Sequence, residues 1–79
     1  MLIGEVSGSV WATKKCEELN GYKLLVVKTD NKNIVAIDTI GAGEGDTVLV
    51  CTGSSARLIA ENAPIDAAIT GIIDTVKNA

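Results

Sequence analysis

The sequence predicts an all-β fold, a small five-stranded closed β-barrel with one short helix. Two observations lead to this prediction. Short apolar runs of strand length recur along the chain, and turn signals separate them at close spacing. Glycines stand within and between these runs, where the bends and corners of a small barrel require them. At 79 residues, the chain is expected to form one domain over residues 1–79.

The first strand is expected in the alternating stretch 2–13. Its even-numbered residues are apolar or small and are assigned to the core, whereas most odd-numbered residues are polar. Gly4 and Gly8 on the inward face predict a bend or the close approach of another backbone. Trp11 falls on the outward face. It is either an isolated exposed aromatic or an anchor against another subunit, because aromatic residues are enriched at protein interfaces.

Four further strands are expected at 22–28, 34–38, 47–51 and 67–75. Residues 30–33 form a hairpin turn signal of Asp, Asn and Lys. Ser54 or Ser55 is expected to cap a short helix that continues to about Glu61, because a serine hydroxyl accepts a hydrogen bond from a free amide of the first turn. Pro64 lies just beyond the expected helix and steers the residue before it out of helical geometry.

Several of these strands are apolar on both faces. In the strand at 22–28, Leu24 and Val26 face one side while Leu25 and Val27 face the other. A small chain that is 47% hydrophobic and has no disulfide framework often depends on a partner for stability. We therefore expect an oligomer, and assign Leu25, Val27 and Trp11 to an outer face that forms the subunit interface.

Composition argues against several functional classes. A net charge of −3 disfavours nucleic acids and anionic membrane surfaces, and no apolar run approaches the ~20 residues of a membrane span. The first residues lack the pattern of a signal peptide, so a cytoplasmic location is expected. The chain has no histidine, and Cys16 and Cys51 are too far apart for a redox pair. We predict no catalytic, cofactor-binding or metal site, and expect one cysteine to be buried in a strand.

The stretch 40–57 holds a glycine loop, an apolar strand and a second small-residue turn. Gly41, Gly43 and Gly45 are spaced unlike a phosphate-binding loop, and no lysine follows them. Glu44 and Asp46 would also repel phosphate. The loop is therefore interpreted as a structural turn or as the lining of an opening.

Six stretches of the chain, in this order, resemble the ethanolamine-utilisation and carboxysome vertex family of bacterial microcompartment shell proteins. They are GSVWATKK (8–15), GYKLLV (21–26), AID (36–38), GAGEGDTVLV (41–50), GSSAR (53–57) and PIDAAITGIID (64–74). Together they span almost the whole chain. The resemblance implies a five-stranded barrel related to the OB-fold, assembled as a cyclic homopentamer. Such rings sit beside hexameric shell proteins at the vertices of a polyhedral shell in the cytoplasm.

The resemblance also directs attention to two groups of residues. The candidates for the central pore or its rim are Gly41, Ala42, Gly43 and Glu44. The further candidates for the subunit interface are Gly53, Ser54, Ser55 and Arg57. Arg57 either pairs with a carboxylate across the interface or is solvated. The alternative function is an OB-like module that binds oligonucleotides or a small ligand, which two aromatic residues and a negative net charge disfavour.

Overall fold

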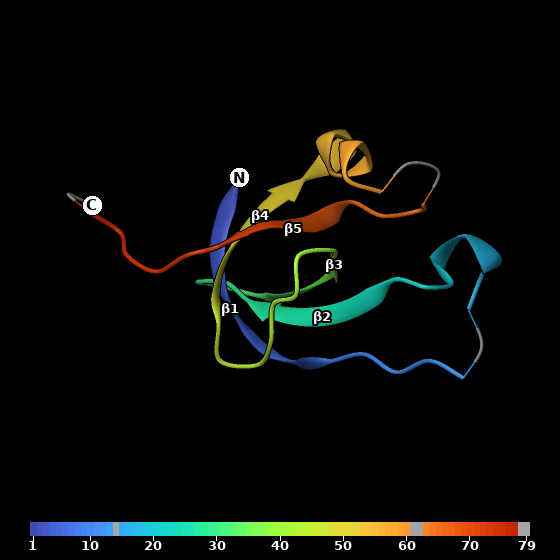
Figure 1. Cartoon of the computed structure of the whole chain (residues 1–79), viewed down its shortest axis with the longest axis horizontal. Helices are drawn as coiled ribbons and strands as arrows, with labels where there is room; N and C mark the ends of the chain where they lie inside the picture. The colour runs from blue at the N-terminus through green and yellow to red at the C-terminus, as the bar shows by residue number, and fades with distance from the viewer. Residues whose placement is uncertain (14, 61–62, 78–79) are drawn as a thin grey trace.

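The computed structural model describes residues 1–13, 15–60 and 63–77. These residues form five β-strands and two short 3-10 helical segments, η1 and η2 (Figure 1). In chain order the elements are β1 (Leu2–Ser9), η1 (Glu17–Leu19), β2 (Lys23–Lys28), β3 (Asn33–Asp38), β4 (Thr47–Thr52), η2 (Gly53–Leu58) and β5 (Ala67–Ile72).

The strands close into a barrel in the order β1-β2-β3-β5-β4, which confirms the predicted fold class. All neighbouring strands are antiparallel except β3 and β5, which pair in parallel. The hairpin between β2 and β3 forms at the predicted turn, where the Thr29 N–H donates to the Lys32 carbonyl at 2.9 Å. No helix among the described residues is long and apolar enough to cross a membrane.

The barrel interior is filled by aliphatic side chains from every strand. β1 alternates between the core and the solvent as predicted, with Gly4 and Val6 buried between exposed neighbours. Gly4 is required at its position because a Cβ atom there would lie 2.5 Å from Cγ1 of Val27 and 2.8 Å from the carbonyl oxygen of Lys28. The predicted close approach of two backbones is thus confirmed between β1 and β2.

The prediction that Leu25 and Val27 lie on the outer face is wrong. Their side chains are 1% and 0% exposed and belong to the interior cluster, whereas Leu24 and Val26 point outward. Both alternating sets of residues in this run are apolar, so the sequence pattern alone cannot show which set faces inward. The register of β2 against β1 and β3 decides the phase, and a one-residue shift would reverse it.

A second apolar cluster lies outside the barrel wall, beneath η2 and the residues that follow it. Ile37, Cys51 and Ala68 of β3, β4 and β5 are buried there against three alanines. The covering alanines are Ala56, Ala60 and Ala63. The buried strand cysteine predicted from the sequence is Cys51, while Cys16 is exposed. Part of the outer apolar surface is therefore covered by the chain itself and needs no second subunit.

The expected serine cap of the helix is wrong. The segment η2 begins at Gly53 after Thr52, and no side chain caps it. The Ser55 hydroxyl instead donates to the Thr52 carbonyl at 2.8 Å. Gly53 turns the chain with φ +72°, a conformation that glycine adopts readily. The expected end of the helix at Glu61 lies outside the described residues.

Candidate assembly surfaces

The glycine loop, residues 41–46, connects β3 to β4 and is shaped by two aspartates. The Asp38 carboxylate accepts hydrogen bonds from the backbone N–H of Ile40 at 3.1 Å and of Gly41 at 3.2 Å. At the other end, the Asp46 carboxylate accepts from the Gly43 N–H at 2.8 Å. Aspartate favours such turns because its short side chain can reach nearby amides. The loop geometry is thus set by local hydrogen bonds.

The loop is also fixed to the barrel. The Gly45 N–H donates to the Val6 carbonyl at 2.9 Å, and the Val6 N–H donates to the Asp46 carbonyl at 2.9 Å. The Lys23 ammonium donates to the Ala42 carbonyl at 3.1 Å. The Ala42 side chain is 1% exposed and packs in the barrel core. Among the pore candidates, Ala42 therefore contributes to the core, and the exposed surface of the loop comes from its neighbours.

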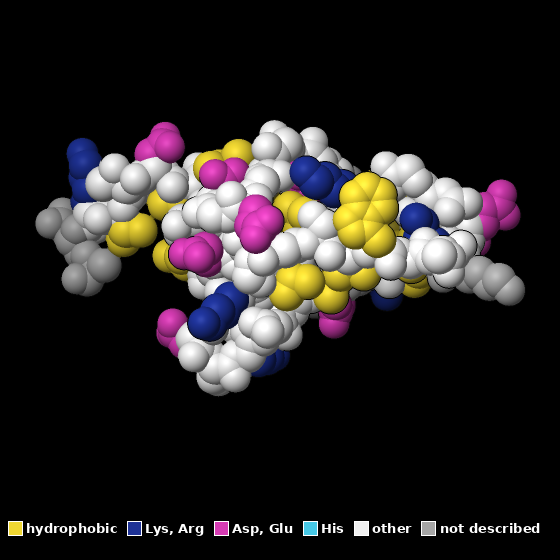
Figure 2. Space-filling view, turned by 90° about the horizontal axis from the view of Figure 1, so that it is seen from below, with side chains coloured by type: hydrophobic (Ala, Val, Ile, Leu, Met, Phe, Trp, Pro, Cys, Tyr) yellow, Lys and Arg dark blue, Asp and Glu magenta, His cyan; other side chains and the backbone are white. Residues whose placement is uncertain are grey.

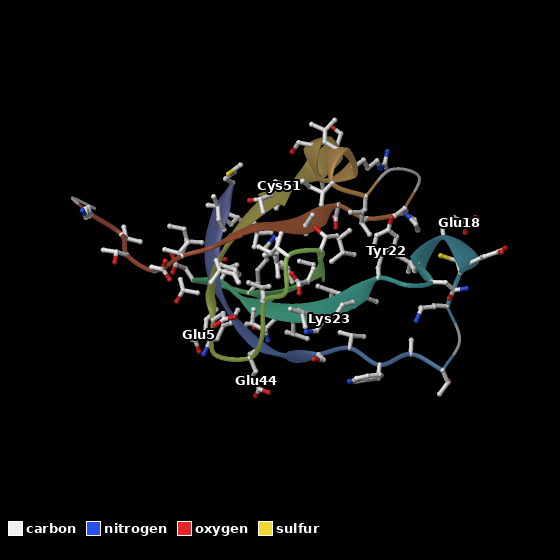
Figure 3. All side chains as sticks on the ribbon, in the orientation of Figure 1. Glu5, Glu18, Tyr22, Lys23, Glu44 and Cys51 are labelled. Carbon is white, nitrogen blue, oxygen red and sulfur yellow. The ribbon has the colours of Figure 1, made fainter. Side chains whose placement is uncertain are left out.

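Glu44 stands at the tip of the loop and is exposed. Figure 3 shows its side chain directed away from the barrel, while Lys23 lies on the strand beside the loop. Gly41 is exposed with φ +91°, and Gly43 is half-buried. The loop therefore offers a small-residue surface with one outward carboxylate.

The second small-residue turn lies at the other end of β4. Gly53, Ser54, Ser55 and Arg57 are exposed, while Ala56 between them is buried against the barrel wall. The Gly53 N–H donates to the Asp66 carbonyl at 2.8 Å, which ties the turn to the start of β5. Because β4 separates the two turns, the structure does not bring the pore candidates and these interface candidates together.

Trp11 follows the end of β1 on an extended segment that runs beside β2, where the Val10 N–H donates to the Leu24 carbonyl at 2.9 Å. Its side chain is 92% exposed, which confirms the predicted outward orientation. A hollow of about 200 Å³ adjoins the indole of Trp11, and its lining includes Ala12, Tyr22 and Leu24. A large aromatic beside a shallow apolar hollow is typical of an interface anchor.

The structure reveals further features that the sequence reasoning missed. Ile3 and Val35 project from the outer faces of β1 and β3 and are 51% and 49% exposed. Hydrophobic side chains also gather between charged ones on the face shown in Figure 2. The anchoring roles of Asp38 and Asp46 were also missed, although aspartates flanking a glycine loop are a recognisable turn signal. The exposed apolar groups had no such signal, because their exposure depends on strand register.

Comparisons with known proteins agree with the fold. Residues 1–74 match the family described as "Ethanolamine utilisation protein EutN/carboxysome". The bacterial microcompartment shell vertex protein GrpN of Rhodospirillum rubrum (strain F11) is 45% identical over 86 residues, which cover 98% of this chain and 97% of GrpN.

Solved structures give the same result. The GrpN pentameric microcompartment shell protein from Rhodospirillum rubrum has a TM-score of 0.89 at 45% identity, with 100% of both chains covered. The structure of CcmL from Gloeobacter violaceus has a TM-score of 0.91 at 38% identity, and covers 96% of this chain and 88% of CcmL.

These relatives are structural shell components and not enzymes, and they do not favour the alternative of an oligonucleotide-binding or ligand-binding module. The matches extend over nearly the whole chain, and the barrel, the glycine loop and the turn after β4 all lie within the matched residues. The chain belongs to the EutN/CcmL family of bacterial microcompartment shell vertex proteins.

Proposed function

We propose that five copies of this chain form a ring that caps a vertex of a microcompartment shell. The observation that carries the proposal is the full-length similarity to a pentameric shell protein, with both chains covered from end to end. A cyclic ring requires two different surfaces on each copy, one of which contacts the other on the next copy. Hexagonal tiles alone make a flat sheet, so a pentagonal ring supplies the curvature that closes the shell. This function is mechanical and requires no active site.

Trp11 is the proposed anchor of the subunit contact. Its 92% exposure leaves a large apolar surface in water, and burial of a side chain of this kind stabilises an interface by about 1.5–3 kcal/mol. Ser54, Ser55 and Arg57 are proposed to lie in the polar rim of a contact, because interfaces surround a desolvated centre with solvated polar groups. Leu25 and Val27 are not part of this proposal, because they fill the barrel core.

The glycine loop is the proposed rim of the central opening. Its small residues permit five loops to converge, and its hydrogen bonds to Asp38 and Asp46 hold it in one shape. Glu44 is the exposed charge of the loop. Five copies would surround the opening with carboxylates, so the rim would disfavour anions and attract cations.

Light scattering coupled to gel filtration tests the ring. The expected mass is five times the 8.2 kDa of one chain. A stable monomer at micromolar concentration would contradict the proposal. Co-expression with sheet-forming shell proteins then tests the vertex role, since closed particles should form only when this chain is present. Closed particles of unchanged shape formed without this chain would contradict the vertex role but would not contradict the ring.

A further inference from the structure

The barrel is closed between β3 and β5 over a very short length. β3 shares six register pairs with β2, but only two pairs with β5 are present among the described residues. A groove of about 1050 Å³ lies beside the unpaired part of β3. Its lining includes the apolar residues Met1, Ile3 and Val35 and the charged residues Asp30, Lys32 and Asp66.

The backbone of Val35 faces this groove. The hydrogen bond from the Thr29 N–H to the Lys32 carbonyl makes Thr29 and Lys32 a hydrogen-bonded pair of the hairpin. Along an antiparallel pair of strands, hydrogen-bonded and non-hydrogen-bonded residue pairs then alternate. By this alternation the N–H and carbonyl of Val35 point away from β2. The backbone of Ile37, two residues later, points the same way, and Ile37 pairs with Ala68 of β5. Val35 has no such pair among the described residues, so β3 presents a short free strand edge there.

A free edge beside a groove with both apolar and charged lining is a site to which an extended segment can add as a further strand. The chain carries a segment of this kind. After β5, residues 73–77 leave the barrel as an arm outside any strand, which Figure 1 shows projecting from the barrel. The last backbone bond that anchors it runs from the Ile73 N–H to the Thr47 carbonyl at 2.8 Å. Val76 on the arm is 52% exposed.

The arm of a chain cannot fill the groove of the same chain. The parallel register places Val35 level with Asp66, just before β5 begins. The arm starts at Ile73, seven residues further along, which corresponds to about 23 Å of strand. The segment from Ile73 to Lys77 is five residues long, and its ends lie only about 13 Å apart when it is fully extended. An arm that fills this groove therefore belongs to another copy, one whose β5 ends beside the groove.

We infer that the C-terminal arm of one copy adds as a strand to the free edge of β3 in the neighbouring copy. This inference rests on the proposed ring and specifies how its subunits are joined. Val76 contacts Val35 and Ile3, and the arm supplies backbone partners for Val35. The arm carries Asp74 and Lys77, and the groove carries charges of both signs, so opposite charges can meet along the strand.

Cross-linking tests the contact. The exposed Cys16 is first replaced by serine, while Cys51 is only 5% exposed and stays. Val35→Cys and Val76→Cys are then combined and treated with a short bismaleimide. We expect a ladder up to five linked chains on a denaturing gel. Each single variant, and the pair Glu18→Cys with Val76→Cys, should give no ladder.

The outcomes separate this inference from the proposed function. A pentamer by light scattering with no ladder would overturn the arm contact and leave the ring. A monomer would overturn both. A cross-link between the two introduced cysteines of one chain would also overturn the contact. It would consume both thiols while the band stays at the mass of a single chain.

A shortened chain that ends at Ile73 gives a second measurement. Because the removed residues include one apolar side chain that the groove buries, the concentration at which half the rings dissociate should rise at least about tenfold. The substitution Lys77→Ala on the full chain is the matched control, and it should change this concentration much less. An unchanged midpoint in the shortened chain would overturn the inference.

Discussion

Two outer regions of the barrel wall are apolar, and the chain treats them differently. The wall formed by Ile37, Cys51 and Ala68 is covered by η2 and its following residues. The second region carries Ile3 and Val35 on the barrel wall and Trp11 on the segment beside β2. These side chains are about half exposed or more. The comparison shows that an apolar outer face does not by itself require a partner. The second region remains for a neighbouring subunit to cover.

The largest effect is expected from Val27→Asp, which tests the barrel interior on which both regions depend. Val27 is fully buried, and an unpaired carboxylate there costs several kcal/mol. We expect an unfolded or insoluble chain, measured by circular dichroism. Val26→Asp on the outward phase of the same strand is the control and should remain folded. A folded Val27→Asp variant would contradict the position of Val27 in the core.

The next effect concerns the contact between β1 and β2. Gly4→Ala places a methyl group within 3 Å of Val27 and of the Lys28 carbonyl, so the strands must separate. We expect the free energy of unfolding to fall by about 1–3 kcal/mol, as for other overpacked sites. Chemical denaturation measures this change. Gly8→Ala is the matched control, because no atom lies within 4 Å of its new Cβ, and it should lose clearly less stability.

The covered region is tested by Ala56→Leu. Ala56 is fully buried between η2 and the barrel wall, and a larger side chain must push η2 outward. A loss of about 1–2 kcal/mol in unfolding free energy is expected. Thermal melting reports it, with Leu58→Ala as a control at an 86% exposed position of the same segment. Equal melting temperatures for the two variants would mean that η2 is not a close-packed cover.

The smallest effect on the fold, and a selective effect on assembly, is expected from Trp11→Ala. An exposed side chain contributes little to folding, so the unfolding free energy of the dissociated chain should change by less than about 0.5 kcal/mol. The ring should nevertheless dissociate at a higher protein concentration, measured by light scattering across a dilution series. Thr13→Ala on the same segment is the control. An undisturbed ring in Trp11→Ala would exclude Trp11 from the contact.

Much of this protein could be read from the chain alone. Alternation in β1 placed Gly4 and Val6 inward, and turn residues at 30–33 located the hairpin, because strand periodicity and turn chemistry are local properties. Strand ends were less accurate. The first strand was expected to reach Thr13 and the last to reach Thr75, but they end at Ser9 and Ile72. These strands end where their pairing with neighbouring strands ends, and the local sequence carries no signal at those residues.

The candidate surfaces were predicted less well than the fold. Trp11 was correctly directed outward because it shares the alternating face with the polar residues Ser9 and Thr13. Leu25 and Val27 were misplaced because their strand is apolar in both phases. The groove beside β3 was not foreseen, since it results from the two-pair junction between β3 and β5. Residues 33–37 have an ordinary strand sequence and carry no mark of a missing neighbour.

The sequence by itself determined the all-β barrel and the membership of a shell vertex family, because patterns of apolar spacing, turns and ordered motifs lie along the chain. The tertiary structure decided which apolar face is interior, which is covered by η2, and which remains open for another copy. Those outcomes depend on the register between strands far apart in sequence, and a shift of one residue exchanges the two faces of a strand.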